Sequence, residues 1–115
     1  MDRVVPTVLL GGVAGSVARW AVGEIGWSAG ISLLVVNTVA SAILGVVVAV
    51  WGDREHPARL ALGVGVCGGL STFSGLAVEL AARLDRGDPL DAFVLAAASL
   101  GFGVAAFLGG RELAP

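Results

Sequence analysis

The sequence predicts an all-α integral membrane protein, a single domain over residues 1–115 with four transmembrane helices. Two observations predict this class. Of the 115 residues, 57% are hydrophobic and 14% are charged, with a mean hydropathy of +0.92, whereas a soluble domain has about 25% charged residues on average. Most charged residues also gather at the two ends and in residues 53–59 and 79–91, which leaves four long apolar segments. A bilayer core needs about 20 apolar residues per helix, so each segment is long enough to span it.

The four helices are expected over residues 4–23, 31–51, 59–84 and 90–109. The intervening residues 24–30, 52–57 and 85–89 contain Gly, Pro and Asp, which end helices and expose the backbone to water. Trp27 and Trp51 fall at predicted membrane edges, where indole rings are enriched. These boundaries predict a multi-pass protein of the cell membrane.

Glycine is enriched, with 18 residues in 115, about twice its usual share of roughly 7%. Small or polar residues recur every four positions in three segments: Gly11, Gly15, Arg19 and Gly23; Asn37, Ser41 and Gly45; Ser99 and Gly103. In lipid, helices associate through close backbone approach at small residues and through interhelical hydrogen bonds. The stripes therefore predict packing faces. Because four helices alone do not easily enclose a pore, a partner subunit is also expected.

The seven basic residues are all arginine, and they divide almost evenly between the two membrane sides. With four spans, one side holds Arg3, Arg54, Arg59 and Arg111, and the other holds Arg19, Arg83 and Arg86. Orientation follows the bias of Lys and Arg near helix ends. This nearly even division of the arginines, four on one side and three on the other, predicts insertion in both orientations and an antiparallel, dual-topology dimer. An oppositely oriented paralogue is the alternative partner.

Residues 65–75 place four glycines and three hydroxyl residues in the middle of the third segment. Such a run forms a poor continuous helix, so the third helix is expected to be broken near its middle. Broken helices persist in membranes where the freed backbone groups face protein, water or an ion. Freed carbonyls can coordinate a cation, and amides and hydroxyls can donate to an anion. The alternative is a tightly packed helix whose hydroxyls bond to their own backbone.

Two further polar residues lie in predicted spans. Asn37 is the only amide side chain in the sequence, and polar groups at membrane depth usually face the bundle interior or a water path. It either donates to a passing anion or links two helices by a hydrogen bond. Arg19 lies one turn from a helix end. It either extends to the membrane surface or attracts anions to a vestibule.

Three motifs resemble one known family. Residues 11–20 (GGVAGSVARW), 36–45 and 65–74 (GVCGGLSTFS) are similar to the first-, second- and third-helix motifs of the bacterial and archaeal fluoride exporters called Fluc or CrcB proteins. The resemblance covers all four helices in order, at matching length. It implies a fluoride-selective channel subunit that exports cytoplasmic fluoride passively, through two pores along the interface of an antiparallel dimer. The expected partners are fluoride, the lipid bilayer and a second copy or a paralogue, and not nucleic acid.

The resemblance also assigns roles to single residues. Asn37 would line the pore with Arg19 at its entrance, and Phe73 would contact fluoride through its ring edge, which is positive. Ser74 and Ser99 would add hydroxyl donors. The backbone carbonyls of Gly68 and Ser71 match the positions that hold a structural sodium ion at the dimer axis. Donors without a deep fixed charge suit conduction, which needs binding that is neither too weak nor too strong.

The sequence departs from the family pattern at two positions. Gly75 and Leu76 stand where the family motif has Thr and Phe, so a second pore phenylalanine is missing. The protein has no tyrosine, and Leu95 occupies the place of the fourth-helix Tyr. These departures favour a heterodimer in which a paralogue supplies the missing rings. A homodimer with altered permeation is the alternative.

Other classes fit less well. A small proton-coupled multidrug exporter needs a carboxylate inside its first helix, but Glu24 lies past that helix and Glu79 lies in the third. A non-conducting or structural partner subunit stays open. An enzyme is not expected, because His56 is alone in a loop and Cys67 has no neighbouring acid or base in the sequence that would form a nucleophilic site.

Overall fold

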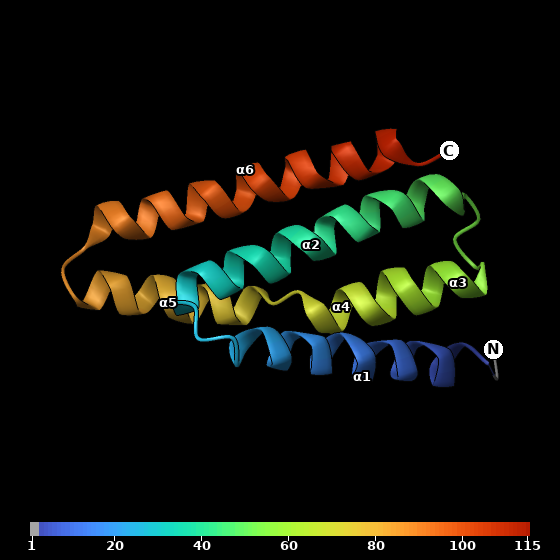
Figure 1. The fold of residues 1–115 in the computed structure, drawn as a ribbon, viewed down its shortest axis with the longest axis horizontal. Coiled ribbons are helices and arrows are strands. Elements are labelled where there is room, and N and C mark those ends of the chain that lie inside the picture. The colour runs from blue at the N-terminus through green and yellow to red at the C-terminus, as the bar shows by residue number, and fades with distance from the viewer. Residues whose placement is uncertain (1–2) are drawn as a thin grey trace.

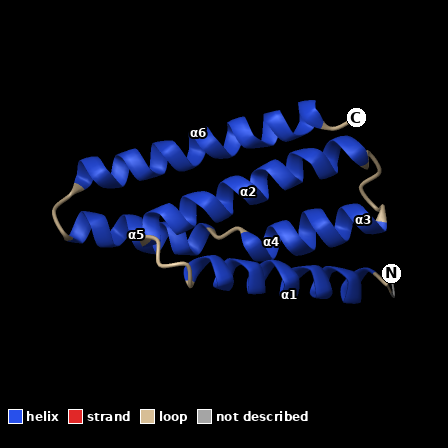
Figure 2. Ribbon diagram, viewed as in Figure 1, coloured by secondary structure: helices blue, strands red, loops and turns tan. Residues whose placement is uncertain are grey.

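The computed structural model describes residues 3–115 as four helical spans that lie side by side along the long axis of the molecule (Figure 1). The first two spans are α1 (Val4–Gly23) and α2 (Ala29–Val50). The third consists of α3 (Pro57–Arg59), the π-helical segment η1 (Leu60–Val66), α4 (Cys67–Leu70) and α5 (Phe73–Asp85). The fourth is α6 (Pro89–Leu113). Over the described residues all regular structure is helical (Figure 2).

Each of the four spans is long and apolar enough to cross a membrane, so the predicted number of helices is confirmed. The first helix has the predicted bounds, whereas both ends of each of the other three spans differ from the prediction, most of them by one or two residues. The second helix begins at Ala29, because the Ser28 side chain accepts a hydrogen bond from the Ile31 amide at 3.3 Å and caps the first turn. The predicted end of the fourth helix at residue 109 is wrong. Gly110 packs against the backbone of Ala42, and this contact with α2 carries α6 on to Leu113.

Close packing at glycine joins the spans in pairs. Gly11 and Gly15 of α1 lie directly against the backbone of η1, where an added Cβ would collide with the carbonyls of Ala61 and Val66. Gly45 of α2 lies against the Phe107 carbonyl of α6 in the same way. The glycine stripes are thus packing faces within one subunit. Gly23 does not share this role, because no atom lies within 4 Å of its Cβ position.

Two extended residues separate α4 from α5. Ser71 has φ −77° and ψ 155°, and Thr72 has φ −150° and ψ 117°. The Thr72 hydroxyl then accepts a hydrogen bond from the Gly75 amide at 3.0 Å and caps the start of α5. We call Ser71 and Thr72 the interruption. It lies near the middle of the third span, and it faces α1 and α2 through the contacts described below.

Candidate functional site

Asn37 of α2 pairs with the backbone of Thr72 through both ends of its amide. Its Nδ2 donates to the Thr72 carbonyl at 3.2 Å, and its Oδ1 accepts from the Thr72 amide at 2.7 Å. The side chain therefore links two spans, as one of the two interpretations of Asn37 expects. An amide nitrogen carries two N–H donors, and one donor on Nδ2 is used in this pairing.

Arg19 of α1 meets the interruption from another side. Its Nη1 donates to the Ser71 carbonyl at 3.3 Å, and the contact is partly buried. The side chain thus turns toward the end of α4 instead of extending away from the protein. Arg19, Asn37, Ser71 and Thr72 form one connected polar cluster at the middle of the bundle.

A groove of about 490 Å³ opens beside this cluster between α2, α5 and α6. We call it the donor groove. Its lining residues are Asn37, Ser41, Ser71, Thr72, Phe73, Leu76, Leu80, Ala96, Ser99 and Leu100. The groove brings together the predicted pore residues Asn37, Phe73 and Ser99. It is lined by neutral polar groups and apolar side chains, with no ionisable side chain among those residues.

The other two predicted pore residues lie elsewhere. Arg19 and Ser74 line a second groove of about 640 Å³ between α1, α2 and α5, together with Trp27 and Glu79. The Ser74 hydroxyl lies 3.2 Å from the Thr72 hydroxyl, so it is connected to the donor groove through Thr72. Within one subunit the predicted residues therefore divide between two neighbouring grooves.

The carbonyls predicted to hold sodium lie where α4 ends. In a continuous helix the Gly68 carbonyl would accept from the Thr72 amide, four residues on, but that amide donates to Asn37. Gly68 is exposed, and no atom lies within 4 Å of its Cβ position. Unwound carbonyls at a helix C-terminus are the groups that coordinate Na⁺ in membrane proteins. Backbone carbonyls are ligands that suit Na⁺, and the Ser71 carbonyl already accepts one hydrogen bond from Arg19.

Two hydroxyls in the described part of the chain are buried without a hydrogen-bond partner, those of Thr38 and Ser99. Both belong to the tightly packed pair α2 and α6. Ser99 lines the donor groove, although its hydroxyl oxygen is itself buried. Sequence reasoning missed Thr38, because a lone Thr in a helix commonly bonds to its own backbone.

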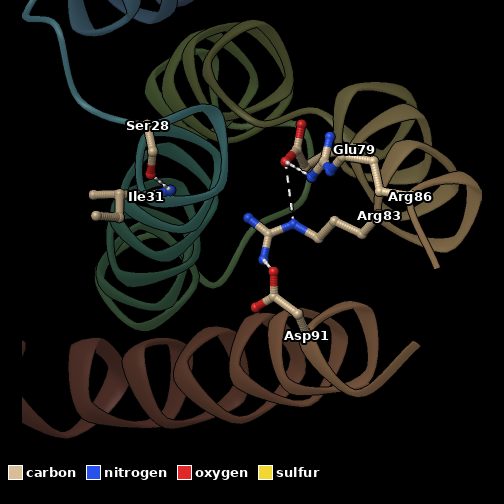
Figure 3. A network of polar contacts seen from close by, with 6 residues as sticks. All are labelled: Ser28, Ile31, Glu79, Arg83, Arg86 and Asp91. Atoms are coloured by element: carbon tan, nitrogen blue, oxygen red, sulfur yellow. Dashed lines mark hydrogen bonds and ion pairs between the residues drawn. The ribbon is translucent and has the colours of Figure 1, made fainter. Parts of the chain in front are cut away.

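An ion-pair network at the far end of α5 was also missed (Figure 3). Arg83 Nε lies 3.1 Å from Glu79 Oε1, and Arg83 Nη1 lies 2.7 Å from Asp91 Oδ2 of α6. The side chains of Arg83 and Glu79 are only 14% and 17% exposed. Gly30 leaves the space that the Arg83 guanidinium fills. The spacing of Glu79 and Arg83, four residues apart, is the signal that could have pointed to their pairing.

The two positions that depart from the family pattern have different surroundings. Leu76 lines the donor groove one turn after Phe73. Leu95 is 6% exposed, packs near Gly30 and is not among the residues that line this groove. A ring missing at position 76 therefore changes the groove, whereas position 95 belongs to the packed interior of the subunit.

Comparison with known proteins gives matches over most of the chain. The model of the CrcB-like protein family (Camphor Resistance, CrcB) matches residues 6–111. The fluoride-specific ion channel FluC of Pyrococcus furiosus is 40% identical over 98 residues, covering 80% of each chain. A FluC of Thermus thermophilus is 39% identical over 112 residues, covering 90% of this chain and 88% of the relative. FluC 2 of Prochlorococcus marinus is 41% identical over 113 residues, covering 94% and 82%.

The family match covers all four spans, and the relatives align over nearly the whole length. The glycine and hydroxyl motifs that carried the resemblance lie where α1, α2 and the third span meet. The resemblance stated from the sequence is therefore confirmed. The chain is a multi-pass membrane protein that belongs to the CrcB-like (FluC) family, a family of ion channels and not of enzymes.

Proposed function

We propose that the chain is a subunit of a fluoride-selective ion channel that conducts passively through pores at a dimer interface. One observation carries the proposal. The donor groove combines an amide, hydroxyls and an aromatic ring without an ionisable side chain. The names of the Pyrococcus and Thermus relatives, both fluoride-specific ion channels, support the same ion.

The groove supplies what fluoride needs in place of water. The N–H of Asn37 that Thr72 does not use and the unpartnered O–H of Ser99 are hydrogen-bond donors, and the ring edge of Phe73 is weakly positive. Neutral donors bind an anion without holding it permanently, which conduction requires. The membrane potential, worth about 2.3 kcal/mol per charge per 100 mV, then drives the anion out of the cell.

A second subunit is proposed because the groove is open on one side. Phe73 is 83% exposed in the single chain, beside polar groups that line the same groove. In contact with lipid, the free donor of Asn37 would stay unpaired, which is costly in hydrocarbon. An antiparallel partner would close the groove. The nearly even arginine distribution supports opposite orientations of the two subunits.

The partner is either a second copy or a paralogue. Because position 76 is Leu, the donor groove has one aromatic ring, that of Phe73, where the family pattern has two. This observation favours a heterodimer in which the paralogue supplies a complete pore, and it makes a non-conducting partner role for this chain the second candidate. The relatives in Prochlorococcus and Rhodococcus have numbered names, FluC 2 and FluC 1, which is consistent with paralogous subunits.

A sodium ion is proposed at the dimer axis, held by the Gly68 and Ser71 carbonyls of both subunits. Its positive charge would offset the partial negative charge at the C-terminal end of the helical half-span that ends at Leu70. Its role would be structural, since backbone carbonyls fix its position without contributing a titratable group.

The test is fluoride efflux from liposomes, measured with a fluoride electrode. Liposomes with this chain alone are compared with liposomes that also contain a paralogue from the same genome, and chloride-loaded liposomes serve as the selectivity control. Asn37→Asp is expected to stop efflux, because a carboxylate replaces a donor and repels the anion. Unchanged efflux in a folded Asn37→Asp channel would remove Asn37 from the pore. No efflux with or without the paralogue would refute the channel proposal.

A further inference from the structure

Within the interruption itself, the Ser71 amide still donates to the Cys67 carbonyl. The other three backbone polar groups of these two residues lack helical partners: the Ser71 carbonyl, the Thr72 amide and the Thr72 carbonyl. A continuous helix would satisfy such groups internally, and an unpaired backbone group in a membrane costs several kcal/mol. Glycine at positions 68 and 69 weakens the helix there, but it does not by itself fix the extended backbone of Ser71 and Thr72. Some other part of the molecule has to stabilise it.

Each of the three groups is paired with a side chain from another span. Arg19 of α1 donates to the Ser71 carbonyl at 3.3 Å. Asn37 of α2 exchanges two hydrogen bonds with Thr72, at 2.7 and 3.2 Å. This reciprocal pairing is the one that a neighbouring strand makes in an antiparallel sheet. The Asn37 side chain thus takes the place of a neighbouring strand for the extended residue Thr72.

Both side chains start from points where their helices are fixed against the third span. Gly15 lies one turn before Arg19, and it lies directly against the Val66 carbonyl. Val36 and Ala40 flank Asn37 and pack in one buried cluster with Cys67 and Leu70. Arg19 and Asn37 therefore reach the interruption from rigid positions on two different helices.

We propose that Arg19 and Asn37 are positioning residues that hold the backbone of Ser71 and Thr72 extended and so set the direction of α5. Thr72 caps α5, and Phe73 follows it directly. The pair thereby places Phe73 at the donor groove and keeps the Gly68 carbonyl free of its helical donor. The consequence for conduction rests on the proposed function; the backbone geometry itself does not depend on fluoride.

The first test is hydrogen exchange by mass spectrometry on the full chain in lipid nanodiscs, without fluoride. Asn37→Ala and Arg19→Met are compared with Thr38→Val, a matched change one residue along α2 that removes an unpartnered hydroxyl and keeps the side-chain shape. We expect exchange in peptides covering residues 71–76 to be about tenfold faster in the two variants. The reason is that each variant lacks hydrogen bonds that hold the interruption against local opening. Exchange in α1 and α6 should not change, and Thr38→Val should match wild type.

Conservative variants separate positioning from general stability. Arg19→Lys keeps a cationic donor for the Ser71 carbonyl and is expected to restore protection to within about twofold of wild type. Where Asn37→Ala does not fold, Asn37→Asp retains the acceptor for the Thr72 amide and is expected to keep that amide slow. Equal exchange at residues 71–76 in wild type, Asn37→Ala and Arg19→Met would overturn the proposal. So would faster exchange spread over all four spans.

Fluoride efflux from the same preparations distinguishes this inference from the proposed function. Lost efflux with unchanged exchange in Asn37→Ala would assign Asn37 to the ion alone and overturn the positioning role. If the wild-type protein passes no fluoride, the channel proposal fails, and the exchange data still decide whether Arg19 and Asn37 hold the interruption.

Discussion

Thr72 has its amide, its carbonyl and its hydroxyl all engaged, the first two with Asn37 and the third with the Gly75 amide. Its neighbour Phe73 is among the most exposed large side chains. At the scale of single residues, the site is thus a fixed backbone that carries an exposed ring. This arrangement suits a ring that completes its contacts in a second subunit.

Leu76→Phe tests whether the missing ring limits conduction. The new ring would lie one turn after Phe73 and line the same groove. We expect fluoride efflux from liposomes with this chain alone to rise by about two- to tenfold, since an aromatic contact is worth about 0.5–1.5 kcal/mol and each 1.36 kcal/mol off a barrier is about tenfold in rate. Leu80→Phe, one turn further along the same groove, is the control. Equal efflux in wild type and Leu76→Phe would show that a single ring is not the limiting feature.

Arg83→Met tests the ion-pair network at the end of α5. Arg83 is largely buried and pairs with both Glu79 and Asp91, whereas Arg86 is 61% exposed and lies 4.0 Å from Glu79. Removing Arg83 leaves the largely buried Glu79 carboxylate poorly paired, so the free energy of unfolding should fall by about 1–3 kcal/mol. Arg86→Met should change it by less than about 0.5 kcal/mol. Denaturant titration in micelles measures the free energy of unfolding of both variants. Equal losses in Arg83→Met and Arg86→Met would contradict the stronger pairing assigned to Arg83.

At the scale of elements, helix pairs are held by backbone contact at small residues. Gly11 and Gly65 lie against each other between α1 and η1, and Gly45 and Gly110 each touch the backbone of the opposite helix between α2 and α6. Apolar side chains gain no free energy by moving from lipid into a helix interface, so this close approach is a main source of helix association.

Gly45→Ala tests that contact. The added methyl would collide with the Phe107 carbonyl, so α2 and α6 must move apart, and the free energy of unfolding should fall by about 1–3 kcal/mol. Gly101→Ala, on α6 with no atom within 4 Å of the added Cβ, should be neutral or slightly stabilising because Ala favours the helix. A denaturant titration in which the two variants behave alike would show that backbone contact at Gly45 contributes little.

The four spans and their glycine faces were predictable, because long apolar runs and spacing of small residues are local properties of the sequence. The hydrogen-bond and ion-pair partners of the polar side chains were not predictable from the sequence. Asn37 has two plausible uses from its sequence position, and only the fold places Thr72 opposite it. The pairing of Arg83 with Asp91 depends on how α5 meets α6. The end of α6 was misplaced because glycine, which stops an isolated helix, serves at Gly110 as a contact with α2.

At the scale of the whole molecule, the amino and carboxyl ends lie at the same end of the bundle (Figure 1), as an even number of spans requires. Arg3, Arg54, Arg59 and Arg111 belong to that end. The opposite end holds Arg83, whose charge is balanced by Glu79 and Asp91. Neither end has a large excess of arginine, so the charge pattern does not select one orientation.

Reporter fusions at the carboxyl terminus test this interpretation, with alkaline phosphatase for one side of the membrane and a fluorescent protein for the other. Both reporters are expected to be active in the wild type. Asp53→Arg with Glu55→Arg adds two arginines to exposed loop positions and should leave one reporter active, because positive charge retains a loop in the cytoplasm. Arg3→Gln, Arg54→Gln and Glu24→Arg together should select the opposite orientation.

Fluoride efflux then connects orientation to assembly. If the functional unit is an antiparallel pair of this chain, cells that express either oriented variant alone should show no fluoride efflux above background, and coexpression of the two variants should restore it. A wild type with a single active reporter would exclude the antiparallel homodimer and require an oppositely oriented paralogue. Restored efflux on coexpression would instead mean that two copies of this chain, in opposite orientations, suffice to close the groove beside Asn37 and Phe73.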